Sequence, residues 1–207
     1  MVLHRFIVFE GLDGAGTSTQ IDRLKEVSTK QLVMPNRFWF TAEPSDGETG
    51  KRIRHILKGR EKASPEELAR LFSDDRNEHL YGVGGIVEHC NKGLICISDR
   101  YTPSSLVYQG LECGFSLPKT LNKDFPLPQI LFFFDIDPEI AAKRMENRPE
   151  KEIFEYLDFQ KRAREAYKSI IPEYAAQDTD CRLITIDAAL PIEDISRTIE
   201  QIITDYI

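Results

Sequence analysis

Residues 10–20 form a glycine-rich segment with hydroxyl side chains, and they are the strongest candidates in this chain for a binding or catalytic role. Gly11, Gly16 and Ser18 occupy three positions of the phosphate-binding pattern G-x-x-x-x-G-K-[ST]. Glycine lets backbone N–H groups approach a phosphate chain closely, and Ser18 stands where such loops supply a hydroxyl ligand for Mg²⁺. The lysine position holds Thr17. The segment therefore predicts a nucleoside triphosphate site that lacks its usual cation.

A glycine-rich turn without any ligand is the alternative interpretation of this loop. The loop follows the apolar run Phe6–Phe9 and precedes helical spacing at Ile21, Leu24 and Val27. A helix that begins near Ser18 would direct its dipole and its free N–H groups at the same anion. We therefore favour a phosphate site. The residues assigned to it are Gly11, Gly14, Ala15, Gly16, Thr17, Ser18 and Thr19.

Composition bounds the class of protein. The chain has 207 residues, which is enough for one α/β domain, and its net charge is −7. Without a basic block, a nucleic-acid partner is not expected. The four cysteines show no C-x-x-C pair and are expected to be buried thiols in a reducing cytosol. We find no signal peptide and no apolar run near about 18 residues, so we expect a cytoplasmic protein without a membrane partner.

Five strand-like apolar runs alternate with helical patterns. Most are continuously apolar, which is typical of strands buried on both faces of a parallel sheet. The runs are Phe6–Phe9, Phe38–Thr41, Leu94–Ser98, Ile130–Ile136 and Leu183–Ile186. The pattern predicts a doubly wound five-stranded parallel sheet of the P-loop NTPase type, in a single domain over residues 1–207, with ligands at the carboxyl ends of the strands.

Helix starts are marked by capping residues. Ser64 with Pro65 and Glu67 predicts an N-cap with a capping box, and Asp137-Pro138-Glu139 predicts a second helix start. A third helix is expected after Pro191, with one apolar face in the core. The residues of that face are Ile192, Ile195, Ile199, Ile202 and Tyr206.

Polar side chains follow two of the strands. Glu43-Pro44 follows the second strand, and Asp99-Arg100-Tyr101 follows the third. Taken singly, Glu43 could be a turn residue, and Asp99 with Arg100 could be a surface ion pair. At successive strand ends of one α/β sheet these groups converge with the glycine loop on a single cleft, and this favours a function.

These residues resemble the thymidylate kinases nearly from end to end. The matching segments are residues 9–16, 43–47, 71–76, 99–110, 135–139 and 186–188, of which 99–110 is the most specific. The resemblance implies transfer of the γ-phosphoryl group of ATP to dTMP. It implies that Phe72 stacks on thymine, that Arg76 hydrogen-bonds the base edge and that Arg100 binds the dTMP phosphate.

The resemblance also implies roles around the sugar and the nucleotide. Asp13 would lie near the 3′-hydroxyl, and Tyr108 would crowd the 2′ position and favour deoxyribose. Asp99 would hold Mg²⁺ through water together with Ser18, and Arg144 would lie along the adenine near Asp187-Ala188. Glu43, Ser105 and Gln109 complete the acceptor pocket. Mg²⁺ would arrive with ATP, and similar proteins are homodimers.

Three positions that usually carry cations in this family are neutral here. Thr17 replaces the loop lysine, Ala42 precedes Glu43-Pro44 where arginine is common, and Ile153 replaces a lid arginine. The lid is expected at roughly residues 145–156. Its Arg148 and Lys151 are the candidates for catalytic charge beside Arg100 and Asp13, and Lys51 and Arg54 are further substitutes.

Two other functions remain open on the sequence. The three neutral positions allow a catalytically impaired nucleotide-binding homologue that acts as a sensor or interaction module. A kinase acting on thymidine itself is a further alternative, although Arg100 beside the base pocket favours an acceptor that already carries a phosphate. The four histidines have no ligand spacing or nucleophile partner, so no catalytic role is assigned to them.

Overall fold

Five parallel strands form the centre of the protein, seen here in a computed structural model that describes residues 1–30, 37–146 and 153–206. The strand order is β2-β3-β1-β4-β5. The bounds are β1 Val2–Gly11, β2 Phe38–Ala42, β3 Ile95–Asp99, β4 Leu127–Asp135 and β5 Arg182–Asp187. The chain leaves β1 toward β3 and β2 and then crosses to β4 and β5, so β1 lies at the topological switch point where doubly wound sheets bind ligands.

The central strands are buried because both of their faces are covered. In β1, the side chains from Phe6 to Phe9 are all inaccessible to solvent, and β4 contributes a similar run. The register pairs Phe9 with Asp99 and Asp99 with Ala42. The carboxyl ends of β1, β3 and β2 therefore meet at one edge of the sheet, as the sequence predicts.

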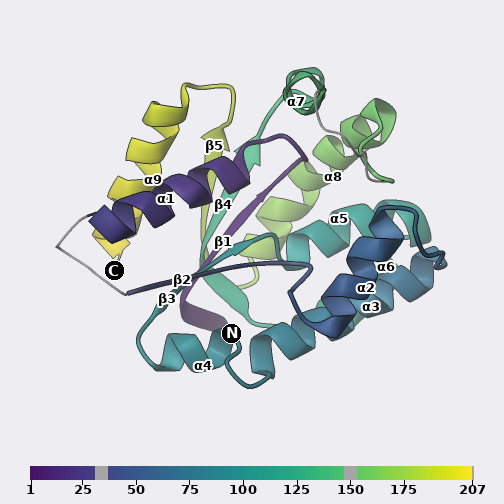
Figure 1. Ribbon diagram of the computed structural model, residues 1–207, viewed down its shortest axis with the longest axis horizontal. Coiled ribbons are helices and arrows are strands. Elements are labelled where there is room, and N and C mark those ends of the chain that lie inside the picture. The colour runs from purple at the N-terminus through teal and green to yellow at the C-terminus, as the bar shows by residue number, and fades with distance from the viewer. Residues whose placement is uncertain (31–36, 147–152, 207) are drawn as a thin grey trace.

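Helices cover both faces of the sheet. Figure 1 shows α1 and α9 side by side on one face and α5 and α8 together on the other. The helices are α1 Thr17–Lys30, α2 Glu48–Leu57, α3 Pro65–Tyr81, α4 Ile86–Asn91, α5 Thr102–Cys113, α6 Ser116–Asn122, α7 Pro138–Met145, α8 Leu157–Ala175 and α9 Ile192–Tyr206. The doubly wound α/β prediction is confirmed. None of the helices in the described ranges is long and apolar enough to cross a membrane.

Two helix starts form as their capping residues predict. The Ser64 hydroxyl accepts a hydrogen bond from the Glu67 N–H at 3.1 Å, and the Asp137 carboxylate accepts one from the Glu139 N–H at 2.8 Å. Such caps satisfy N–H groups that the helix itself leaves free. α7 therefore begins directly after β4, which brings it beside the site.

The apolar face predicted for α9 is buried only in part. Ile195 and Ile199 of α9 are buried, but Ile192 is 45% exposed, so its assignment to the core is wrong. Ile192 instead lines the cleft described below, because it stands at the first turn of α9, beyond the packed face. All four cysteines are free thiols; Cys113 is half-buried and the other three are buried.

Candidate active site

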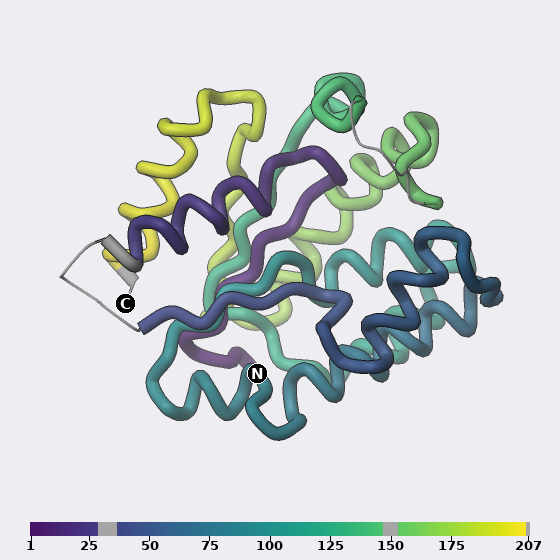
Figure 2. Tube along the Cα trace, viewed as in Figure 1, coloured from purple at the N-terminus to yellow at the C-terminus, as the bar shows by residue number. Residues whose placement is uncertain are grey.

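A cleft of about 630 Å³ lies at the carboxyl ends of the strands. Its wall combines the glycine loop after β1, the turn after β2, the Asp99-Arg100-Tyr101 turn after β3 and residues of α3, α5 and α7. In Figure 2 the chain runs along β1, turns at the glycine loop and reverses its direction in α1. One cavity thus holds both the phosphate loop and the predicted acceptor residues.

The glycine loop adopts a conformation that needs its glycines. Gly14 has φ +81° and Gly16 has φ +98°, both in the left-handed region that glycine tolerates best. A Cβ on Gly14 would lie 2.6 Å from the carbonyl oxygen of Ala141, so α7 packs directly against the loop. The loop returns into α1 at Thr17, which is half-buried and lines the cleft together with Ser18 and Thr19.

Ser18 and Asp99 together fit a magnesium ion. The Ser18 hydroxyl donates to the Asp99 carboxylate at 2.7 Å. The other carboxylate oxygen of Asp99 is buried, and the described residues offer it no hydrogen-bond partner. A hydroxyl and a carboxylate are the hard oxygen ligands that Mg²⁺ prefers, and phosphate oxygens and water complete such sites. The pair therefore suits an ion that arrives with a nucleotide.

Arg144 of α7 closes the nucleotide side of the cleft. Its guanidinium donates to the carbonyl oxygen of Ala188 at 2.9 Å and to that of Ala15 at 3.4 Å. It thus bridges the glycine loop and the loop after β5, where the resemblance places the adenine.

Arg100 lies at the opposite side of the glycine loop and pairs with Asp13. The guanidinium donates to one carboxylate oxygen of Asp13 at 2.6 Å, and the Tyr108 hydroxyl donates to the other at 3.2 Å. The guanidinium also lies over the Tyr108 ring, 5.3 Å from its centroid. The Arg100 and Asp13 side chains are 23% and 22% exposed. A partly solvated, rigidly held guanidinium fork is suited to bind a phosphate.

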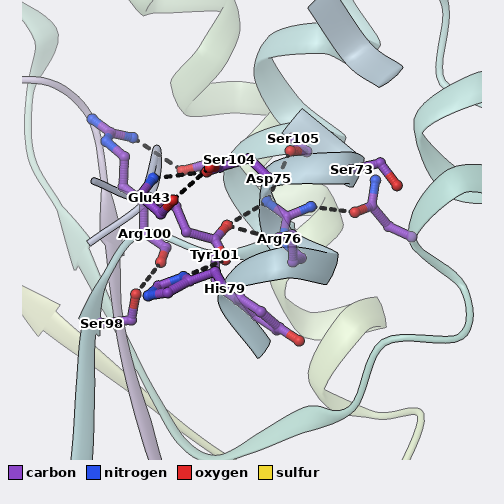
Figure 3. Close-up of polar contacts among 12 residues, drawn as sticks. Glu43, Ser73, Asp75, Arg76, His79, Ser98, Arg100, Tyr101, Ser104 and Ser105 are labelled. Atoms are coloured by element: carbon purple, nitrogen blue, oxygen red, sulfur yellow. Dashed lines mark hydrogen bonds and ion pairs between the residues drawn. The ribbon is translucent and has the colours of Figure 1, made fainter. Parts of the chain in front are cut away.

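Arg76 of α3 forms a buried ion pair with Glu43. Two guanidinium nitrogens donate to one Glu43 oxygen, at 2.7 and 2.9 Å, and both side chains are almost fully buried. Further N–H groups donate to Ser105 at 3.0 Å and to Asn122. Figure 3 shows Arg76 pointing from α3 toward Glu43 and Ser105. Four of its five N–H groups are thus used within the described residues, which leaves one for a ligand in the cleft.

The remaining acceptor residues differ in their access to the cleft. Phe72 is half-buried and lines it, as does Gln109. Among the assigned residues that the structure describes, only Gly11 and Ser105 stay outside the lining. Ser105 lies behind Arg76. Gly11 ends β1, where a Cβ would lie 2.8 Å from the carbonyl oxygen of Phe134, so this glycine serves close packing of the sheet.

The candidates for replacement charge separate into three groups. Arg54 lines the cleft, where its guanidinium donates to the carbonyl oxygens of Pro44 and Ser45. Lys51 pairs with Glu48 in an exposed contact. Arg148 and Lys151 lie outside the described residues, as does the middle half of the predicted lid, residues 147–152.

Sequence reasoning missed a buried polar network that supports these residues. His79 contacts Glu43 at 3.3 Å and Thr41 at 2.6 Å, Gln160 donates to Asp13 at 3.2 Å, and Tyr167 donates to Glu10 at 3.0 Å. The only available signal was a charged residue, Glu10, inside an apolar strand.

Glu10 is inaccessible to solvent, and its burial raises the pKa of its carboxyl from 4.5 to about 7, against the opposing effects of Arg100 and of hydrogen bonds from Ser104, Tyr101 and Tyr167. Because the pKa in the folded state is the higher one, folding keeps a proton that the unfolded chain loses above pH 4.5. This stabilisation is complete below that pH and is lost as the pH rises through about 7.

We therefore expect the stability of the protein, relative to a Glu10→Gln variant, to fall as the pH rises from 4.5 to about 7. The fall should be on the order of 3 kcal/mol in the free energy of unfolding. Urea unfolding of both proteins across this pH range measures it, and all other titrating groups cancel in the difference. A difference that does not change with pH would contradict the expected ionisation of Glu10.

Comparison with known proteins points to one family. The family model described as thymidylate kinase matches residues 9–199. A protein of Treponema pallidum, named as an inferred thymidylate kinase, is 40% identical over 208 residues, covering 99% of this chain and 97% of the relative. A thymidylate kinase of Leptospira interrogans is 38% identical over 172 residues, covering 81% and 82%. An inferred thymidylate kinase of Methanococcus maripaludis is 43% identical, covering 82% and 78%.

Proposed function

The chain belongs to the thymidylate kinase family, and on that premise we propose that it transfers the γ-phosphoryl group of ATP to dTMP. An oxygen of the dTMP phosphate forms the new bond to the γ-phosphorus, the bond to the β-phosphate oxygen breaks, and dTDP and ADP result. The observation that carries the proposal is the single cleft shared by the glycine loop and by Arg100. Phosphoryl transfer needs donor and acceptor held in line in one such cavity.

The acceptor pocket supports dTMP. Arg100 supplies a charged, oriented fork for its phosphate, and the remaining N–H of Arg76 is available to the base edge. Phe72 offers a ring for stacking on the base. Asp13 and Tyr108 are fixed to each other at 3.2 Å, where they would border the sugar.

The donor side uses backbone and hydroxyl groups. The glycine loop and the start of α1 would bind the phosphates through N–H groups and the helix dipole. Ser18 and Asp99 would hold Mg²⁺, which neutralises phosphate charge when bound. Arg144 would lie along the adenine, since it already bridges the loops on either side. The lid residues Arg148 and Lys151 remain our candidates for supplying charge at the transferred group.

The alternatives draw less support. Family membership together with a retained acceptor pocket favours catalysis over a sensor role, and nothing in the comparisons supports an impaired homologue. A kinase for thymidine would have no phosphate to place beside Arg100. We further propose a cytoplasmic homodimer, for which the exposed Tyr81 and Val83 at the end of α3 are candidate contacts.

The acceptor is identified by an ADP-release assay with Mg-ATP and a panel of acceptors. We expect dTMP to react with a kcat/KM at least about tenfold above that of dUMP, which lacks the methyl group that an apolar part of the pocket would bury. Thymidine and the ribonucleotides UMP, CMP, AMP and GMP should react more slowly still. Comparable turnover of thymidine would favour the nucleoside kinase, and turnover of none of them by folded protein would favour the sensor.

A further inference from the structure

Glu10 holds a fully buried carboxylate that the proposed chemistry does not use. It is the penultimate residue of β1, and the hydrogen bonds of its side chain run to Tyr101, Ser104 and Tyr167, on the acceptor side of the cleft. One oxygen accepts the N–H groups of Tyr101 and Ser104, at 2.8 and 3.1 Å. The other accepts the hydroxyls of Ser104 and Tyr167, at 2.7 and 3.0 Å. Above a pH of about 7, where the carboxyl is ionised, its four acceptor positions are thus occupied.

The two backbone bonds fix the turn that carries Arg100. The helix α5 begins after Tyr101, whose side chain caps none of the described N–H groups, so Glu10 caps α5 from a different element. Arg100 precedes this start with φ +72°, a conformation that a side chain other than glycine adopts only under constraint. Its own N–H donates to the carbonyl oxygen of Phe9 at 2.9 Å. The end of β1 therefore holds the strained turn from both sides.

The two hydroxyl bonds fix the side chain of Arg100. A hydroxyl has a single hydrogen. Ser104 and Tyr167 also lie 3.0 Å from each other, but an ionised Glu10 can only accept, so both hydroxyls give their hydrogens to it. Their lone pairs then face the Arg100 guanidinium, which donates to Ser104 at 3.0 Å and to Tyr167 at 3.4 Å. Figure 3 shows Ser104 next to Arg100. If either hydroxyl turned its hydrogen toward the guanidinium, two donors would meet.

We propose that Glu10 is a positioning residue for the acceptor phosphate, because it orients Ser104 and Tyr167 to accept from Arg100 and holds the turn on which Arg100 stands. The inference rests on the proposed function in one respect, namely that Arg100 binds the phosphate of the acceptor. It does not require Glu10 to touch any substrate. In this proposal Glu10 sets the orientation of the Arg100 guanidinium indirectly, through Ser104 and Tyr167.

The test is a Glu10→Gln variant, which keeps the shape of the side chain. The amide oxygen can still accept both backbone N–H groups, but the amide nitrogen donates to the two hydroxyls and reverses their direction. Calorimetry with dTMP and with thymidine, at a pH above 7 where Glu10 of the unmodified protein is ionised, separates the phosphate contact from the base and sugar contacts. We expect dTMP to bind at least about tenfold more weakly, thymidine to bind as before, and the KM for ATP to stay within about threefold.

A second pair of variants keeps the proposal testable if Glu10→Gln does not fold. Tyr167→Phe removes one oriented hydroxyl. Tyr174→Phe, seven residues further along α8 and also buried, removes a hydroxyl that makes no hydrogen bond to Glu10 or Arg100 among the described residues. We expect Tyr167→Phe to weaken dTMP binding about threefold without affecting thymidine, and Tyr174→Phe to change neither.

Three results would overturn the inference: unchanged dTMP affinity in Glu10→Gln, an equal loss of dTMP and thymidine affinity, or equal effects of the two tyrosine variants. The second of these would indicate a purely structural role. Failure of the proposed function is a different result, since the unmodified protein would then bind or turn over no dTMP.

Discussion

Replacing Arg100 with lysine should lower kcat/KM for dTMP by about 10²- to 10³-fold, the range for loss of a preorganised charged donor. The guanidinium is held by Asp13 at 2.6 Å, by Ser104 at 3.0 Å and by the carbonyl oxygen of Gly11 at 3.2 Å. A lysine ammonium cannot reproduce this planar fork, so it would lose either its supports or the phosphate. Arg100→Ala should be worse, because Asp13 would then face the dTMP phosphate without a countercharge. Steady-state kinetics with varied dTMP measures both.

Arg164 provides a matched control for the Arg100 variants. It pairs with Asp135 at 2.7 Å, with side chains 24% and 25% exposed, almost as in the Arg100 pair, but it is outside the lining of the cleft in the described structure. Arg164→Lys should change kcat/KM less than about threefold, since a partly exposed ion pair contributes little on its own. Equal losses in the two lysine variants would show that Arg100 acts through stability and would contradict its assigned role.

Restoring the missing cation is expected to accelerate the reaction. Thr17→Lys should raise kcat/KM for ATP by about ten- to a hundredfold, less than the full effect of a donor that evolved in place. The argument is electrostatic. The described guanidiniums of the cleft are already bound by acceptors of the protein: Arg54 and Arg144 by carbonyl oxygens, Arg76 by Glu43 and Arg100 by Asp13. Varied ATP at saturating dTMP measures the gain.

A Thr17→Val variant controls for the hydroxyl, which it removes while keeping the shape of the side chain. It should lower the rate by no more than about tenfold, the value of a neutral hydrogen bond. If Thr17→Lys leaves the rate unchanged or lowers it, the cleft already receives its charge from elsewhere. Arg148 and Lys151 would then be the residues to replace next.

The strands could be predicted because burial on both faces leaves a direct mark on composition. The apolar runs locate all five strands to within a few residues. β1 is longer than its apolar run because Val2 and Leu3 also pair with β4, before an irregularity in the register. The assignment of Ile192 to the core is wrong because helical periodicity identifies the apolar face of α9 but not the residue at which packing against that face ends.

The residues that line the cleft could be predicted from the sequence, whereas the buried residues that hydrogen-bond to them could not. Thr17, Ser18, Arg100 and Arg144 stand in local motifs at strand or helix ends, and all of them line the cleft. Glu10 and Tyr167 are 157 residues apart in the chain, so their hydrogen bond leaves no local pattern. Because such supports join side chains from different elements, only the folded arrangement reveals them.

The most direct test of the whole account is transfer of labelled γ-phosphate from Mg-ATP to dTMP by the unmodified protein, with Arg100→Ala beside it. We predict label in dTDP at a rate that is proportional to enzyme, requires Mg²⁺ and is lost in the variant. Folded protein that binds dTMP but forms no labelled dTDP, or that forms it equally well without Arg100, would contradict the account.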